Sequence, residues 1–235
     1  MHQFVVAPPA FDWQTFGMIV GIIGDLLWLL AYILTIRVGF KEKAFGIPML
    51  AICFNFSWEF IYVVLEPSQN SLKYYLDLSW LLADIVIVYQ LARYGKKLQP
   101  VPQMRKHFYA ALVVTMAFCF IGQLAYHQQF LGVDPYGYQS AYDINLMMSI
   151  LFIFLFFDRQ GMRGLSYGAA WCKMLGTGVL SLGTFLEFQH AKVHAPFMDF
   201  LFVSIFAADI FYIYLLHSAQ VQGQQPPTGA LRAEA

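Results

Sequence analysis

The sequence predicts an all-α integral membrane protein, in which residues 1–217 form a single domain of seven transmembrane helices. Composition supports this fold class, because 59% of the 235 residues are hydrophobic and only 12% are charged, about half the charged share of a soluble domain. Mean hydropathy is +0.57. Seven apolar stretches also approach or exceed the roughly 20 residues that a helix needs to cross a bilayer.

These stretches divide the chain into helices and short connections. The expected spans are 16–36, 44–65, 75–94, 108–127, 142–157, 167–189 and 197–217. The fifth is short, and we expect it to extend into its flanks. The connections are too short to hold a second domain. Residues 218–235 are polar and rich in Gly, Pro and Gln, which predicts a disordered tail.

Basic residues predict the orientation of the bundle, because cytoplasmic loops carry an excess of Lys and Arg. Eleven of them fall in the loops after the first, third and fifth spans and in the tail, whereas only Lys73 and Lys192 fall on the opposite side. The N-terminus is therefore expected outside and the C-terminus in the cytoplasm. The 14 basic residues equal the 14 acidic ones, so the charge gives no indication of a nucleic-acid partner.

Acidic residues inside the apolar spans are the most informative feature of the chain. Glu59 lies in the run "CFNFSWEFIYVV", and Asp25, Asp84 and Asp209 lie well inside other spans. A charge at the centre of a membrane helix costs about 2.5 kcal/mol or more. Lys173 is the only basic residue away from the last residues of a span, and we expect it to extend to the membrane interface. Most of the acids must therefore be protonated, hydrogen-bonded or facing a polar cavity.

Depth along the helices places these acids in one layer. At 1.5 Å per residue, the four carboxyl groups lie near the middle of their spans or in the outer half. They can therefore share one cavity, although the sequence does not require it. Asn55, Glu59 and Tyr62 are spaced i, i+4 and i+7, so they lie on one helix face.

Aromatic residues accompany each central acid on its own helix face. They are Trp28 near Asp25, Tyr62 and the adjacent Trp58 near Glu59, Trp80 near Asp84, and Tyr212 near Asp209. Aromatic rings attract cations, so an acid within such a lining fits carbocation chemistry on a lipid-soluble polyene. For the Asp25–Trp28 and Trp80–Asp84 pairs, simple hydrogen bonding between helices is the alternative.

Two segments resemble a known family. "FNFSWEFIY" in the second span and "IFAADIFYIY" in the last are similar to the small integral-membrane terpene cyclases, which are pyripyropene-type enzymes of meroterpenoid and indole-terpenoid pathways, with bacterial relatives. The resemblance implies that Glu59 and Asp209 are needed for catalysis, and we expect the two carboxyl groups to meet in one cavity and share a proton. Which of them gives the proton stays open; we favour Glu59, positioned by Asn55 and Trp58.

The resemblance also implies the reaction. A terminal epoxide or alkene of a prenylated, farnesyl-type aromatic or indole substrate would be protonated, and the cation would then pass along the chain. This is a class II-like cyclisation of the isomerase or lyase type, without metal or cofactor. The substrate would come through the membrane lipids, from an upstream prenyltransferase or epoxidase. The membrane would be the plasma membrane in a bacterium and the endoplasmic reticulum in a fungus.

Other membrane functions fit less well. A retinal-binding protein needs a lysine near the middle of its last helix, and "FMDFLFVSIFAADIFYIYLLH" has none. A proton-coupled small-molecule transporter could use the same buried acids as a relay, but paired Gly or Pro interruptions in the two halves, typical of many transporters, are missing. A structural or signalling protein would need no lined cavity around Glu59.

Overall fold

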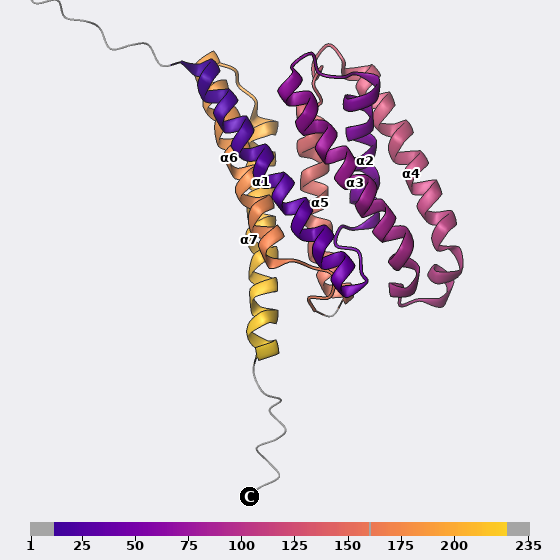
Figure 1. The fold of residues 1–235 in the computed structure, drawn as a ribbon. Coiled ribbons are helices and arrows are strands. Elements are labelled where there is room, and N and C mark those ends of the chain that lie inside the picture. Colours follow the sequence, from indigo (N-terminus) through magenta and orange to yellow (C-terminus); the bar gives the residue numbers. More distant parts are fainter. Residues whose placement is uncertain (1–11, 160, 225–235) are drawn as a thin grey trace, which may run out of the picture.

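The computed structural model describes residues 12–159 and 161–224. These residues form seven α-helices, and none of the described residues lies in a β-strand (Figure 1). The helices are α1 (Trp13–Glu42), α2 (Met49–Phe60), α3 (Ser71–Leu98), α4 (Pro102–Phe130), α5 (Tyr138–Arg159), α6 (Tyr167–Ala191) and α7 (Pro196–Gln224). A π-helical turn, Ile61–Leu65, continues α2 directly after the face that carries Glu59; such turns are frequent at functional sites.

Helix starts follow local sequence signals. The Asn70 side chain caps α3 by accepting hydrogen bonds from the amides of Leu72 and Lys73, and Ser166 caps α6 through the amide of Ala169. Side-chain oxygens at this position satisfy amides that have no partner within the helix. These caps, with the prolines that begin α4 and α7, fix the short connections that fold one helix back against the next.

Six of the seven expected spans fall within these helices, and the second, 44–65, is helical only from Met49 onward, as α2 and the π-helical turn. Six helices are long and apolar enough to cross a membrane, and the α2 region, Met49–Leu65, is a shorter apolar helix. The fifth span extends into its flanks as expected, since α5 covers 138–159. The prediction that the disordered tail starts at residue 218 is wrong, because α7 continues to Gln224. The rest of the tail, 225–235, lies outside the described residues.

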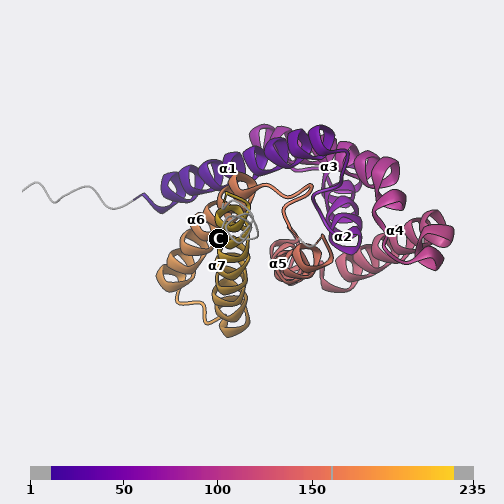
Figure 2. The same ribbon diagram turned by 90° about the horizontal axis from the view of Figure 1, so that it is seen from below.

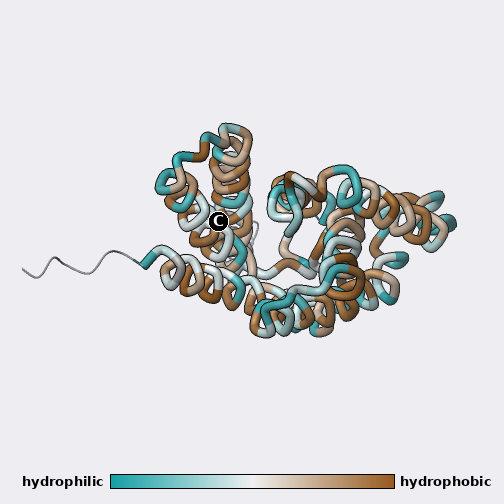
Figure 3. Tube along the Cα trace, turned by 90° about the horizontal axis from the view of Figure 1, so that it is seen from above, coloured by the Kyte–Doolittle hydropathy of each residue, from teal (hydrophilic) through white to brown (hydrophobic). Residues whose placement is uncertain are grey.

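Six helices form a ring. Going around it, α1 packs against α6, α6 against α7, α7 against α5, α5 against α2, α2 against α3, and α3 against α1. Figure 2 shows this order from one end of the helices and Figure 3 from the other. Helix α4 lies outside the ring against α2 and α3. Because the chain closes the ring with its first and sixth helices, residues far apart in sequence face a common interior.

The contact between α1 and α6 depends on close approach of the two backbones. A Cβ atom added at Gly176 would lie 3.0 Å from the carbonyl oxygen of Gly24 and 3.0 Å from the Trp28 ring. Small residues at such contacts are typical of helix packing in membranes. Gly176 thus allows Trp28 to lie flat against α6 on the inner side of the ring.

Candidate active site inside the helix ring

A cavity of about 680 Å³ lies inside the ring and is lined by residues of α1, α2, α3, α5, α6 and α7. This volume falls within the range of about 300–1,000 Å³ that is usual for small-molecule sites. The cavity reaches the first turns of α1 and α3, where Trp13 and Lys73 line it. It therefore extends toward the end of the bundle at which α1 begins (Figure 1).

Glu59 lines this cavity from α2 and is only 3% exposed. Its Oε2 atom is buried and has no hydrogen-bond partner among the described residues. The neighbouring Trp58 is held in place because its Nε1 donates to the Gly137 carbonyl and to Ser140 Oγ, both at 3.1 Å. These bonds tie α2 to the start of α5, so the face that carries Glu59 is fixed toward the interior.

A second carboxyl group lies close to Glu59. Asp84 on α3 is fully buried, and its Oδ2 accepts a hydrogen bond of 2.9 Å from Asn55 Nδ2. The same Asn55 nitrogen donates to Tyr32 Oη at 2.6 Å, and Asp84 Oδ1 has no partner. Glu59 and Asp84 interact electrostatically. Ionising both would place two like charges in the buried interior, which is unfavourable.

Among the described residues, no basic side chain forms a salt bridge with Glu59 or Asp84. Lys73 lies at the mouth of the cavity and both oxygens of Asp77 accept its ammonium hydrogen bonds at 2.9 Å. Asp25, which lines the cavity from α1, interacts electrostatically with Lys73 and Asp77. Lys73 also interacts electrostatically with Glu59, but its hydrogen bonds go to Asp77.

Aromatic rings cover much of the wall near these acids. Trp28, Trp58 and Trp80 line the cavity, together with Tyr138 and Tyr142. The Nε1 atom of Trp80 is buried without a hydrogen-bond partner. A ring face within about 6 Å of a cation attracts it, so this wall can stabilise positive charge in a bound molecule.

Asp209 is placed differently. Both of its oxygens accept hydrogen bonds of 2.8 Å from Lys173 Nζ, and Lys173 also donates to Ser149 Oγ at 2.7 Å. The expectation that Lys173 extends to the membrane interface is therefore wrong. Lys173 is 5% exposed and forms a buried ion pair between α6 and α7. Asp209 lines neither this cavity nor the smaller pocket described next.

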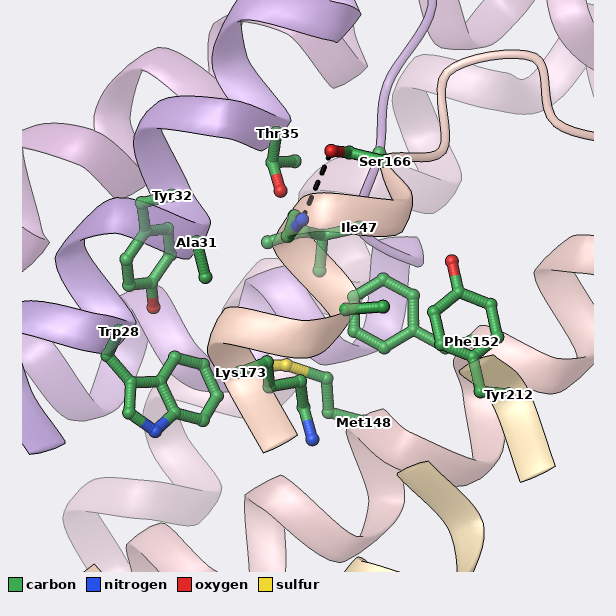
Figure 4. Close-up of a pocket in the computed structure, with 13 residues that line it drawn as sticks. Trp28, Ala31, Tyr32, Thr35, Ile47, Met148, Phe152, Ser166, Lys173 and Tyr212 are labelled. Carbon is green, nitrogen blue, oxygen red and sulfur yellow. Dashed lines mark hydrogen bonds between the residues drawn. The ribbon is translucent and has the colours of Figure 1, made fainter. Parts of the chain in front are cut away.

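The smaller pocket, of about 30 Å³, adjoins the large cavity and shares Trp28, Tyr32 and Met148 with it. Figure 4 shows Lys173 near Trp28 and Met148, and Tyr212 beside Phe152. The Phe152 and Tyr212 rings are stacked at 5.2 Å between centroids. Lys173 lines this smaller pocket, whereas Glu59 lines only the large cavity.

The structure brings together most of the residues singled out from the sequence. Six of them line the large cavity: Asp25, Trp28, Asn55, Trp58, Glu59 and Trp80. Asp84 lies directly behind the wall, bonded to Asn55. Tyr62 points instead toward α4, where its Oη is 3.3 Å from His127 Nδ1.

The expectation that Glu59 and Asp209 meet in one cavity does not describe this arrangement. The carboxyl group that lies near Glu59 is Asp84, and the partners of Asp209 are Lys173 and Ser149. The depth of a residue in the membrane allowed either Asp84 or Asp209 to lie near Glu59. Depth does not show which residues of other helices are its neighbours.

Sequence reasoning missed two polar groups of the site. Lys173 was the only basic residue away from the last residues of a span, and an ionisable residue there is by default a functional candidate. Asn145 on α5 lines the cavity, donates to Thr177 Oγ1 at 3.0 Å, and leaves its Oδ1 without a partner. An amide in the otherwise apolar fifth span was the signal that could have identified it.

Comparison with known proteins adds independent information. A family model of the Pyr4-like transmembrane terpene cyclases matches residues 3–222. The terpene cyclase andB of Emericella variicolor is 28% identical over 191 residues, which cover 79% of this chain and 80% of andB. The terpene cyclase macJ of Penicillium terrestre is 25% identical, covering 81% of this chain and 76% of macJ. The terpene cyclase pyr4 of Aspergillus fumigatus is 24% identical, with 89% and 90% covered.

Proposed function

Because the chain belongs to the family of Pyr4-like transmembrane terpene cyclases, we propose that Glu59 is the acid that starts its cyclisation reaction. The substrate is a prenylated aromatic or indole compound with a farnesyl-type chain that ends in an epoxide or an alkene. The observation that carries this proposal is the unpartnered, buried Oε2 of Glu59 on the wall of a ring-lined cavity.

The first chemical step transfers the Glu59 proton. With an epoxide, the proton bonds to the ring oxygen, the bond from that oxygen to the more substituted carbon breaks, and the nearest double bond supplies the electron pair for a new carbon–carbon bond. With an alkene, the terminal double bond itself takes the proton and leaves a tertiary cation. A general acid in position contributes about 10²–10⁴-fold to such a step.

The rest of the reaction moves the cation and ends it. Each double bond in turn attacks the cation. Loss of a proton from carbon, or capture by an internal hydroxyl oxygen that then loses its proton, gives a neutral product and offsets the proton that Glu59 gave, so the cascade is a net isomerisation. The rings of Trp28, Trp58 and Trp80 support positive charge along this route. The Asn55–Asp84–Tyr32 hydrogen bonds hold the helix faces that surround Glu59. Asp209 is the second carboxyl group that we propose to be required.

The proposal includes the placement of the protein in its membrane. All seven helices cross the bilayer, with the N-terminus outside and the C-terminus in the cytoplasm, as the distribution of basic residues indicates. The cavity then opens toward the outer half of the membrane, where a lipophilic substrate can reach it. A proton-coupled transporter would use the same acids, and membership of the cyclase family favours an enzyme over it.

Membranes that contain the protein provide the test. Epoxidised and unepoxidised farnesylated aromatics are incubated with them, and products are identified by mass spectrometry and NMR. We expect an isomer of the same mass from the wild type and at least about 100-fold less from Glu59→Gln, since the general acid is lost. The matched control is Glu66→Gln, a nearby carboxyl group that is 58% exposed. Wild-type activity in Glu59→Gln would overturn the proposal.

A further inference from the structure

We infer that Lys173 and Asp209 act as one neutral unit that positions the cavity wall at Trp28, so that Asp209 serves the reaction through Lys173 and exchanges no proton with the substrate. This inference rests on the proposed function and deepens it. It assigns a role to Lys173 as a positioning residue, and it separates the two carboxyl groups into one that reacts and one that holds the site.

Every hydrogen-bond donor of the Lys173 ammonium group has an acceptor in this unit. A lysine ammonium has three donors, and Lys173 Nζ contacts three oxygens: both carboxyl oxygens of Asp209 at 2.8 Å and Ser149 Oγ at 2.7 Å. Ser149 in turn donates to the Asn145 carbonyl at 2.9 Å. The unit therefore joins α5, α6 and α7 on the side of the ring opposite α3.

Asp209 is poorly placed to act as an acid or a base. It is 2% exposed, it lines neither cavity, and a proton on either oxygen would break a contact with a buried ammonium group. Glu59 shows the opposite arrangement, because it lines the cavity and one of its buried oxygens has no hydrogen-bond partner among the described residues. Loss of the Asp209 carboxylate would leave the Lys173 ammonium buried without its counter-ion, which is strongly unfavourable.

The unit reaches the cavity through Trp28. Lys173 Nζ lies 5.5 Å from the centroid of the Trp28 ring, and Trp28 lines both the smaller pocket and the large cavity. Gly176, one turn after Lys173, leaves the space that this ring needs. Figure 4 shows the lysine and the indole side by side. Trp28 therefore stands between the ion pair and the place where a substrate cation would lie.

Charge balance gives the unit its effect on the reaction. As long as Asp209 neutralises Lys173, the ion pair adds no net charge next to the Trp28 ring. Without Asp209, an uncompensated ammonium would lie behind a ring that faces a carbocation, and like charges repel more strongly in a medium of low dielectric constant. The cascade would then end early, before the cation reaches that wall.

Four variants in membranes test the inference: Asp209→Asn, Lys173→Met, the double variant Lys173→Met/Asp209→Asn, and Lys173→Arg, which keeps the charge. Lys106→Met, an exposed lysine of α4, is the control. Product is measured per amount of protein that elutes as a single species in gel filtration. We expect Asp209→Asn to lose at least about 100-fold and to release incompletely cyclised products, a change that a purely structural defect would not produce.

The double variant decides the question. We expect it to recover product formation to within about tenfold of the wild type, with the wild-type product distribution, and Lys173→Arg to retain activity. A folded double variant that is as inactive as Asp209→Asn would overturn the inference. A double variant that does not fold would also overturn it, because neutrality would then not be what matters. Glu59→Gln is measured in parallel. An active Glu59→Gln variant would contradict the proposed function. If Glu59→Gln and the double variant are both inactive, only the inference about Lys173 and Asp209 is contradicted.

Discussion

Glu59 and Asp209 are two buried acids of one membrane bundle in opposite electrostatic situations. Glu59 lies on the wall of a cavity of about 680 Å³ and has an oxygen without a partner, with Asp84 as its neighbour. Asp209 lies away from the cavity and both of its oxygens contact Lys173. The difference shows that a carboxyl group within a span can be either a reactive group or one half of a neutral pair.

The same contrast appears in the surrounding residues. Around Glu59, Asn55 fixes Asp84 and Tyr32 while an oxygen of each carboxyl group stays unpartnered. Around Asp209 the donors of Lys173 are all used. Unpartnered buried polar atoms cost about 1–3 kcal/mol each, and a protein keeps them where a ligand or a reaction uses them. We therefore regard the Glu59 side as the reactive side of the bundle.

The largest expected effect concerns stability. Asp209→Asn leaves the Lys173 ammonium buried without its counter-ion, which should cost about 3–5 kcal/mol. Glu59→Gln removes no ion pair and should change stability much less. Thermal unfolding in detergent, followed by circular dichroism, measures both. Equal unfolding midpoints for the two variants would contradict the distinction between a paired and an unpaired carboxyl group.

A smaller effect is expected on turnover, which a substitution in the cavity wall should lower more than a substitution on the lipid-facing surface. Trp80→Leu removes a ring that lines the cavity, and loss of a desolvated cation–π contact of about 2 kcal/mol corresponds to about thirtyfold in turnover. Trp80→Phe keeps a ring and should lose less. The control is Trp171→Leu on the outer side of α6, where the indole is 39% exposed. If Trp171→Leu lowered turnover as much as Trp80→Leu, the assignment of Trp80 to the cation path would be wrong.

The smallest expected effect lies at the contact between α1 and α6. Gly176→Ala places a Cβ 3.0 Å from a backbone oxygen and from Trp28, and overpacking of this kind costs about 1 kcal/mol or more. Gly178→Ala on the same helix meets nothing within 4 Å and should be neutral or gain up to about 1 kcal/mol in helix propensity. Unfolding midpoints in detergent compare them. A midpoint for Gly176→Ala at or above that of Gly178→Ala would show that Trp28 is not held by this contact.

The sequence was sufficient to predict the features that depend on one helix at a time. Apolar length located all seven helices, and the i, i+4 spacing put Asn55 and Glu59 on one face, which the structure confirms at the cavity. The same spacing misplaced Tyr62, because the face carrying Glu59 is wide enough to divide between the cavity and α4. Tyr62 lies next to His127 there, a neighbour that no periodicity within α2 could reveal.

Features that depend on two or more helices could not be predicted in this way. Lys173 and Asp209 are 36 residues apart, and their pairing follows from the order of helices around the ring. Asp84 became the neighbour of Glu59 for the same reason, since α3 packs against α2. Depth in the membrane was the strongest constraint available from the sequence, and it left the partners of each acid undetermined.

The central claim is that Glu59, and not Asp209, meets the reactive end of the substrate. A structure of the Glu59→Gln variant bound to its uncyclised substrate tests it directly. We predict the epoxide oxygen or terminal alkene carbon within about 3–3.5 Å of the side chain at position 59, with Asp209 still paired to Lys173. A reactive end that contacts Asp209, or a substrate chain outside the ring-lined cavity, would contradict the account.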